Sequence, residues 1–196
     1  MAAFPVPAMK LCLLRHAPLP PGSGLAGRRD LAAVLPLAPE LAALQARLQA
    51  LAPTRIWSSP ALRCRQTCAA LGLEAETDPR LWEQDFGAWE QPGTAIPDLG
   101  PLPLEELARH RPPGGESFAD LVARTRPALE AMTGTALIIA HAGTVRAALS
   151  LVIGPAALSF AVAPLSLTVI EGSPGQWSVS FVNWTAPELV PHPQTS

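Results

Sequence analysis

Three short apolar runs constrain most strongly what this chain can fold into. They are KLCLLR at 10–15, RIWSS at 55–59 and TALIIA at 135–140, and each has the length of a buried strand. Stretches with helical spacing lie between them; Leu41, Leu44, Leu48 and Leu51 recur at intervals of three and four until Pro53. This alternation predicts an α/β fold, a three-layer α/β/α sandwich around a mostly parallel central sheet.

The segments between and after these runs complete the expected layout. A helix is expected over 61–71, ended by Gly72, then an extended segment over 74–82 and a loop over 91–103. Ser117 with Asp120 three residues later predicts a capped helix, and 143–153 predicts another. LSLTVIEG and WSVSFVNW, joined by SPGQ, predict a final pair of strands. We expect one domain over 1–196, with its core at about 9–185 and a flexible C-terminal tail.

Composition narrows the class of protein. With 196 residues, 48% hydrophobic and 15% charged, the chain is suited to one domain with a large core. Its net charge of -2 and lack of a basic tract argue against a nucleic-acid partner. Gly154-Pro155 and Pro164 interrupt the uncharged stretch 147–170, which argues against a membrane span, and MAAFPVPAMK lacks the pattern of a secretory signal. A cytoplasmic protein without a membrane partner is expected.

The cysteines do not indicate a disulfide framework or a metal site. The chain has three of them, Cys12, Cys64 and Cys68. Cys64 and Cys68 are four residues apart on an expected helix, but two thiols alone rarely hold zinc. We therefore expect buried, unmodified cysteines, and neither a metal nor another cofactor.

Polar residues follow each of the three expected strands. Arg15 and His16 end the first, Ser58-Ser59-Pro60 and Arg63 follow the second, and His141 follows the third. Ligands of parallel sheets bind at the carboxyl ends of the strands, so these groups are expected to meet in one pocket. Guanidinium groups match phosphate oxygens, and their charge lowers the pKa of a nearby imidazole, which keeps it neutral and nucleophilic.

Four segments carry a resemblance to a known family. LLRHA, SSPALRCRQTCAAL, RLWEQDFGAWE and IIAHAGTVRAAL stand in the order found in the histidine phosphatase superfamily, the phosphoglycerate mutase-like group. The resemblance implies that His16 attacks phosphorus and forms a phosphohistidine. It further implies that Arg15, Arg63 and His141 bind the phosphoryl oxygens, and that Glu83 protonates the leaving oxygen and then activates water.

Other residues are given supporting or structural roles. Arg28, in the loop 17–30, and Trp82, beside Glu83, are expected to help bind substrate. Arg146 is expected to form an ion pair, and His110 to be a solvated helix end. The sequence departs from the family pattern at Ala17, where the family has glycine, so a methyl group is expected to crowd the backbone near the phosphate.

Three functions stay open at this point. They are a phosphomonoesterase, a phosphoglycerate mutase with the same phosphohistidine, and a non-catalytic domain that binds a phosphorylated ligand. A mutase needs cations for a second anionic group, and residues 91–104 carry no charge apart from Asp98, which favours hydrolysis. PPGGESFADLVAR resembles α-ribazole-5′-phosphate phosphatases and suggests that substrate. The expected partner is thus a small phosphorylated molecule, and the expected assembly is a homodimer.

Overall fold

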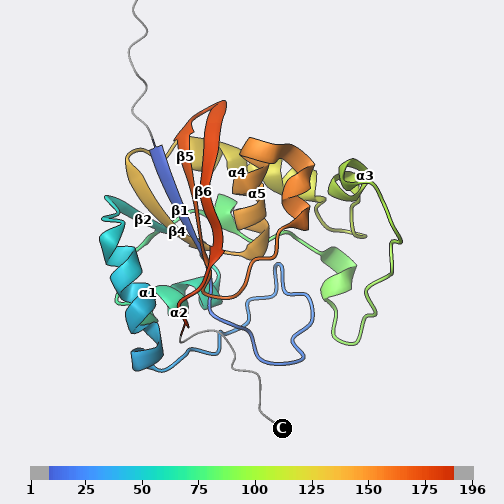
Figure 1. Ribbon diagram of the computed structural model, residues 1–196. Helices are drawn as coiled ribbons and strands as arrows, with labels where there is room; N and C mark the ends of the chain where they lie inside the picture. Colours follow the sequence, from blue (N-terminus) through green and yellow to red (C-terminus); the bar gives the residue numbers. More distant parts are fainter. Residues whose placement is uncertain (1–8, 188–196) are drawn as a thin grey trace, which may run out of the picture.

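The computed structural model describes residues 9–187 and has a six-stranded sheet at its centre (Figure 1). The strand order is β3-β2-β4-β1-β5-β6. β1 and β2 each run parallel to β4, and β3 runs parallel to β2, whereas β5 and β6 are antiparallel to their neighbours. The mostly parallel sheet is confirmed. The strands are β1 (Met9–Arg15), β2 (Arg55–Ser58), β3 (Glu76–Thr77), β4 (Thr135–Ala140), β5 (Leu167–Ser173) and β6 (Gln176–Trp184).

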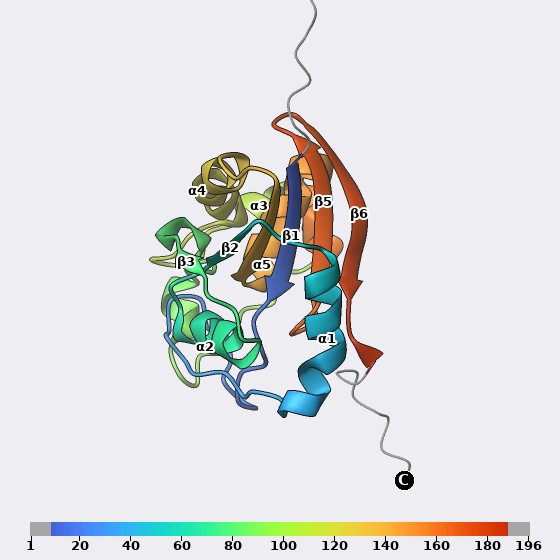
Figure 2. The ribbon, with the colours of Figure 1, turned by 90° about the vertical axis from the view of Figure 1, so that its left-hand side faces the viewer.

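Helices cover both faces of the sheet, which confirms the three-layer sandwich (Figures 1 and 2). On one face lie α1 (Ala38–Ala50) and α2 (Leu62–Ala70); on the other lie α4 (Phe118–Glu130) and α5 (Ala142–Ile153). The shorter helices are α3 (Leu104–Arg109) and the 3-10 turns η1 (Pro79–Leu81), η2 (Gly87–Glu90) and η3 (Gly154–Ser159).

β1 is apolar throughout because both of its faces are covered. Leu11 and Leu13 pack in the cluster beneath α4 and α5, whereas Cys12 and Leu14 pack in the cluster beneath α1 and α2. Successive side chains of a strand point to opposite faces, so a doubly covered strand needs apolar residues at every position. The register sets Arg15 opposite Ala140, and therefore both histidines that follow, His16 and His141, emerge at the same edge.

Local signals placed most element ends correctly. Ser117 and Asp120 form the capping box of α4, and Gly72, in a left-handed conformation (φ 70°), follows the end of α2. The extended segment expected over 74–82 is wrong beyond Thr77. Asp78 accepts the N–H of Arg80, and Pro79 fixes φ, so the chain turns into η1.

One helical stretch, Ala142–Ser159, is long and apolar enough by composition to cross a membrane. In the fold it comprises α5 and η3, which meet at Gly154, and Val145, Ala148 and Leu149 of α5 are buried in the core. The predicted interruption at Gly154-Pro155 is therefore present. The expected flexible tail, with His192, lies outside the described residues, and the single-domain division stays a prediction.

Ser117→Ala should lower the free energy of unfolding by about 1 kcal/mol, because the Ser117 hydroxyl caps α4 by accepting the N–H of Asp120. Urea unfolding followed by circular dichroism measures the change. Thr94→Ala, in an exposed loop, is the matched control and should shift stability by less than about 0.5 kcal/mol. Equal effects of the two substitutions would contradict the capping role.

Candidate active site

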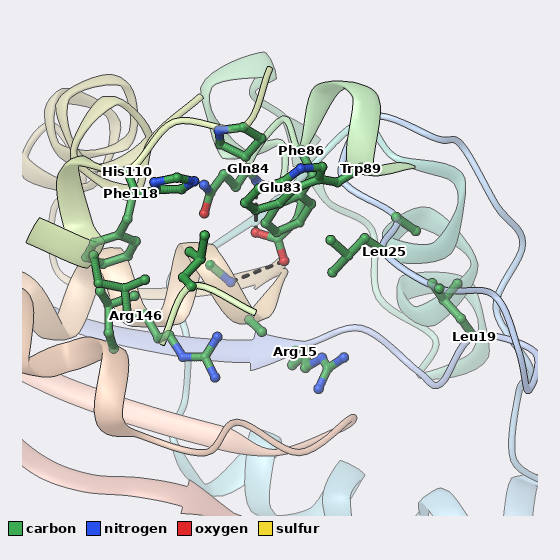
Figure 3. Close-up of a pocket in the computed structure, with 18 of the residues that line it drawn as sticks. Arg15, Leu19, Leu25, Glu83, Gln84, Phe86, Trp89, His110, Phe118 and Arg146 are labelled. Carbon is green, nitrogen blue, oxygen red and sulfur yellow. Dashed lines mark hydrogen bonds between the residues drawn. The ribbon is translucent and has the colours of Figure 1, made fainter. Parts of the chain in front are cut away.

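A pocket of about 370 Å³ opens at the carboxyl end of β1, beside the N-terminus of α5 (Figure 3). Its charged and titratable lining residues are Arg15, His16, Glu83, His110 and Arg146. Aromatic and aliphatic side chains enclose the rest, and they come from the 17–30 loop, the 83–89 segment, the region around α3, the start of α4 and η3. These are Leu19, Leu25, Phe86, Trp89, Leu99, Leu107, Phe118 and Leu158.

His16 is held through one ring nitrogen, and the other, Nε2, has no hydrogen-bond partner among residues 9–187. Its backbone N–H donates to Ala140, and its Nδ1 lies 2.6 Å from the carbonyl oxygen of Ala17. Because a carbonyl only accepts, Nδ1 carries the proton and Nε2 carries the lone pair. His16 lines the pocket, so the structure presents an imidazole suited to nucleophilic attack.

His141 stands next to His16 in the opposite tautomer. The two ring centroids are 5.2 Å apart in an edge-on arrangement. Arg63 donates its Nε–H to Nδ1 of His141 (3.2 Å), so the proton of His141 is on Nε2, which lies 2.8 Å from the hydroxyl of Ser59. The Ser58-Ser59 turn and α2 thus fix the second imidazole.

Burial keeps both imidazoles neutral. It lowers the pKa of His16 to about 3, with further lowering by the charges of Arg63 and Arg15. Burial also lowers the pKa of His141 well below its usual value, and the charge of Arg63 acts in the same direction. These lowered pKa values agree with the neutral imidazoles that the sequence predicts.

The two arginines expected at the phosphate occupy different environments. Arg15 lines the pocket, and its Nη1 donates to the carbonyl of Val162, while its buried Nε has no hydrogen-bond partner among the described residues. Arg63 is fully buried. Its Nη1 donates to Arg29 O, and its Nη2 donates to Ala26 O and Gly27 O, all at 2.9 Å. In this state Arg63 lies behind the pocket wall.

Glu83 is fixed at the pocket by backbone amides. Gly143, in the first turn of α5, donates its N–H to Oε2 (3.2 Å, dashed in Figure 3), and Gln84 donates its N–H to Oε1. A methyl group on Gly143 would lie 2.0 Å from Oε1, so only glycine allows this approach. The N-terminus of α5 thus binds the Glu83 carboxylate.

A second buried carboxylate, Glu90, was not recognised from the sequence. It accepts the backbone N–H groups of Arg28, Arg29 and Phe86 and so joins the 17–30 loop to the segment that carries Glu83. Its place at the end of RLWEQDFGAWE was the only sequence signal. We infer a positioning role for Glu90.

Two expected substrate-binding residues lie outside the pocket wall. Arg28 pairs with Asp85 and Glu116, which hold its guanidinium away from the pocket. The ring of Trp82 stacks on His141 and lies beneath the guanidinium groups of Arg28 and Arg63. Both residues therefore support the site from behind. Ala17 is likewise buried beside α2, where its N–H donates to Thr67, so its methyl group does not enter the pocket.

Two residues dismissed at the sequence level line the pocket instead. Arg146 was expected in an ion pair, but among residues 9–187 it forms none, and its Nε donates to the Phe160 carbonyl. His110 ends α3 and stacks on Trp89, with centroids 5.5 Å apart. Spacing along α5 was the missed signal, because Arg146 follows the pocket residues Ala142 and Gly143 by one helical turn.

The described residues contain no group of three or more His, Cys, Asp or Glu side chains that could hold a metal ion. Cys12, Cys64 and Cys68 are free and buried. Burial raises the pKa of Cys12 to about 11, and it also raises the pKa of the Cys64 thiol beside His141. None of these thiols is therefore a ready nucleophile.

Comparison with known proteins identifies the family. Residues 39–185 match the model of the histidine phosphatase superfamily (branch 1). The chain belongs to this superfamily. A bifunctional protein of Mycobacterium tuberculosis is 31% identical over 147 residues, which are 65% of this chain and 40% of that protein. Mouse 6-phosphofructo-2-kinase/fructose-2,6-bisphosphatase 1 is 31% identical over 111 residues, 53% of this chain and 24% of that one. The chain thus spans less than half the length of these relatives.

Solved structures agree with this assignment. A mycobacterial glucosyl-3-phosphoglycerate phosphatase in complex with VO3 superposes with a TM-score of 0.77 at 25% identity, covering 90% of this chain and 99% of that one. A protein from Thermus thermophilus superposes with a TM-score of 0.64 at 30% identity, covering 83% of this chain and 93% of that one. The phosphoglycerate mutase-like fold is confirmed.

Stability should fall as the pH drops below 6.5, the ordinary pKa of histidine. Between that value and about 3, the folded-state pKa of His16, the unfolded chain binds a proton that the folded chain excludes. Each such imidazole contributes a slope of up to about 1.4 kcal/mol per pH unit. Urea unfolding at pH 7, 6 and 5 measures this slope. His16→Asn removes one such imidazole and should reduce the slope by up to about 1.4 kcal/mol per pH unit. An unchanged slope in that variant would contradict a neutral, buried His16.

Proposed function

We propose that this protein is a phosphomonoesterase that works through a phosphohistidine on His16. The observation that carries the proposal is the free Nε2 of His16 in a pocket that also holds Arg15 and Glu83. Membership of the histidine phosphatase superfamily and the similarity to a solved phosphatase support hydrolase chemistry. The intact set of titratable groups argues against a non-catalytic phospho-ligand-binding domain.

The proposed reaction has two steps. Nε2 of His16 attacks phosphorus, the P–O bond to the leaving group breaks, and Glu83 gives its proton to the leaving oxygen. Glu83 then takes a proton from water, which attacks phosphorus and releases His16 and inorganic phosphate. Arg15 neutralises charge on the phosphoryl oxygens. Arg63, held by the 26–29 carbonyls, contributes its charge from behind the pocket wall, and its bond to Nδ1 fixes His141 beside His16.

The substrate is proposed to be a small phosphorylated metabolite. α-Ribazole 5′-phosphate is one candidate, supported by the PPGGESFADLVAR segment and by the aromatic side chains Phe86, Trp89 and Phe118 around the pocket. The names of the mouse bisphosphatase and the glucosyl-3-phosphoglycerate phosphatase supply two further classes, a sugar bisphosphate and a phosphoglycerate. A cytoplasmic location and a homodimer stay predictions.

Phosphoglycerate mutase is the second candidate. The sequence favoured hydrolysis over the mutase because residues 91–104 offer no cation for a second anionic group, yet Arg146 lines the pocket. One experiment decides between the phosphatase and the mutase. The protein is supplied with 3-phosphoglycerate and its bisphosphate primer, and separately with α-ribazole 5′-phosphate, and NMR follows free phosphate and 2-phosphoglycerate. Phosphate release without isomer supports the phosphatase; 2-phosphoglycerate with little free phosphate would establish the mutase.

His16→Ala should abolish turnover of p-nitrophenyl phosphate and remove the covalent intermediate, because the lone pair on Nε2 of His16 is the proposed nucleophile. Rapid quenching in base with ³²P-labelled substrate, followed by peptide mapping, measures the label. An acid-labile, base-stable phosphate on His16 is expected. Label retained by His16→Ala, or mapped to another residue, would contradict the assignment of His16 as the nucleophile.

Glu83→Gln should slow hydrolysis of alkyl phosphates by about 10²–10⁴-fold, since a poor leaving group needs a proton as its bond breaks. p-Nitrophenyl phosphate should lose much less, because its leaving group departs as a stable anion. Rates of both substrates with wild type and variant measure the difference. Asp98→Asn, in the exposed 91–104 loop, is the control and should alter neither rate. An equal loss on both substrates would remove the general-acid role.

A further inference from the structure

The pocket contains one guanidinium that the proposed phosphoryl transfer does not require. Arg146 lies on α5, three residues after Gly143, and lines the pocket together with Ala142 and Gly143. Residues three and four apart share a helix face, so α5 presents both the amide that binds Glu83 and this cation to the same space. Figure 3 shows the Arg146 guanidinium beside that of Arg15, with Glu83 across the pocket.

The 160–162 segment binds the guanidinium groups of Arg146 and Arg15 through backbone carbonyls, which do not neutralise their charge. The carbonyl oxygen of Phe160 accepts Nε–H of Arg146 at 3.0 Å, and the carbonyl of Val162 accepts from Arg15. Within residues 9–187, no carboxylate forms an ion pair with either arginine. Glu83 is the carboxylate of the pocket wall, and backbone amides already bind it. The pocket thus has an excess of positive charge.

The order of groups along α5 places Arg146 on the leaving-group side. His141, at the start of the helix, lies beside His16; Gly143 holds Glu83; and Arg146 follows about 4.5 Å further along the axis. Helical side chains tilt toward the N-terminus, which brings the guanidinium back toward Glu83. Burial lowers the pKa of Arg15, and the charge of Arg146 lowers it further, as expected of two guanidinium groups that line one pocket.

We propose that Arg146 binds a second anionic group of the substrate, carried by the leaving group. The preferred substrates are then phosphomonoesters with a carboxylate or a second phosphate near the ester oxygen. This inference rests on the proposed phosphatase function. It ranks phosphorylated acids and bisphosphates above α-ribazole 5′-phosphate, whose leaving group has no anionic group. A carboxylate or phosphate also matches the paired N–H donors of the Arg146 guanidinium.

The test compares substrates that differ only in that group. 3-Phosphoglycerate carries a carboxylate where glycerol 3-phosphate carries a hydroxymethyl group, and glycerol 1,3-bisphosphate carries a second phosphate. Wild type should prefer at least one anionic substrate over glycerol 3-phosphate by about 10- to 100-fold in kcat/KM. Whichever is preferred identifies the anion. A wild-type enzyme without either preference would overturn the proposal.

Variants then assign the preference to Arg146. Arg146→Gln should bring the ratio of kcat/KM values close to one, and Arg146→Lys should keep part of it, because it retains the charge but loses the fork. Arg126→Gln removes an exposed arginine of α4, paired with Glu130, and should keep the wild-type ratio. Thermal unfolding checks that each variant is folded. An equal loss on the anionic and neutral substrates would overturn the proposal, since it would place Arg146 at the phosphoryl group.

A binding measurement separates this inference from the proposed function. If wild type releases no phosphate from any substrate, p-nitrophenyl phosphate included, the phosphatase function fails. The second-anion site is then tested by calorimetric titration of His16→Ala, with and without Arg146→Gln. The ligands are 3-phosphoglycerate, glycerol 1,3-bisphosphate and glycerol 3-phosphate. Tighter binding of an anionic ligand that disappears with Arg146→Gln supports it, and an unchanged affinity ratio overturns it.

Discussion

The buried guanidinium of Arg63 is the interaction on which the arrangement of the site depends. A charge without solvent contact is costly unless its N–H groups are bonded, and Arg63 meets this need with the carbonyls of Ala26, Gly27 and Arg29 and with Nδ1 of His141. One side chain of α2 therefore fastens the loop after β1 to the residue after β4. Loss of these bonds would leave the charge uncompensated and release the loop.

The same loop is locked from its other side by Glu90, which binds the amides of Arg28 and Arg29. The loop and the segment that carries Glu83 are in close contact, because a methyl group on Gly27 would lie 1.9 Å from the Gln84 carbonyl oxygen. Gln84 neighbours Glu83, so the packing that holds the loop also sets the position of the proposed general acid. Catalysis by preorganised groups requires this kind of rigidity, since reorientation during the reaction would raise the barrier.

The pocket separates two tasks between its walls. The end of β1 and the start of α5 bring neutral imidazoles and the Glu83 carboxylate together. The outer wall includes Trp89 stacked against His110, together with Arg146, and in the proposed reaction it would surround the leaving group. Since one fold serves many substrates, the features that distinguish this protein from other members of the superfamily are expected in that outer wall.

The sequence by itself determined the layers of the fold and the chemistry at its centre. Apolar runs such as TALIIA define buried strands by length, and polar residues after them must meet at one edge of a parallel sheet, so His16 and His141 could be paired without coordinates. Tertiary structure alone decided which cations face the pocket. Whether an arginine is free depends on partners distant in sequence. Arg28 pairs with Asp85 and Glu116, and Arg63 donates to loop carbonyls. Among residues 9–187, Arg146 bonds to Phe160 O through Nε, which leaves its terminal nitrogens available to the pocket. Residue type and spacing fix where a side chain starts, but long-range packing fixes what its charged end can reach.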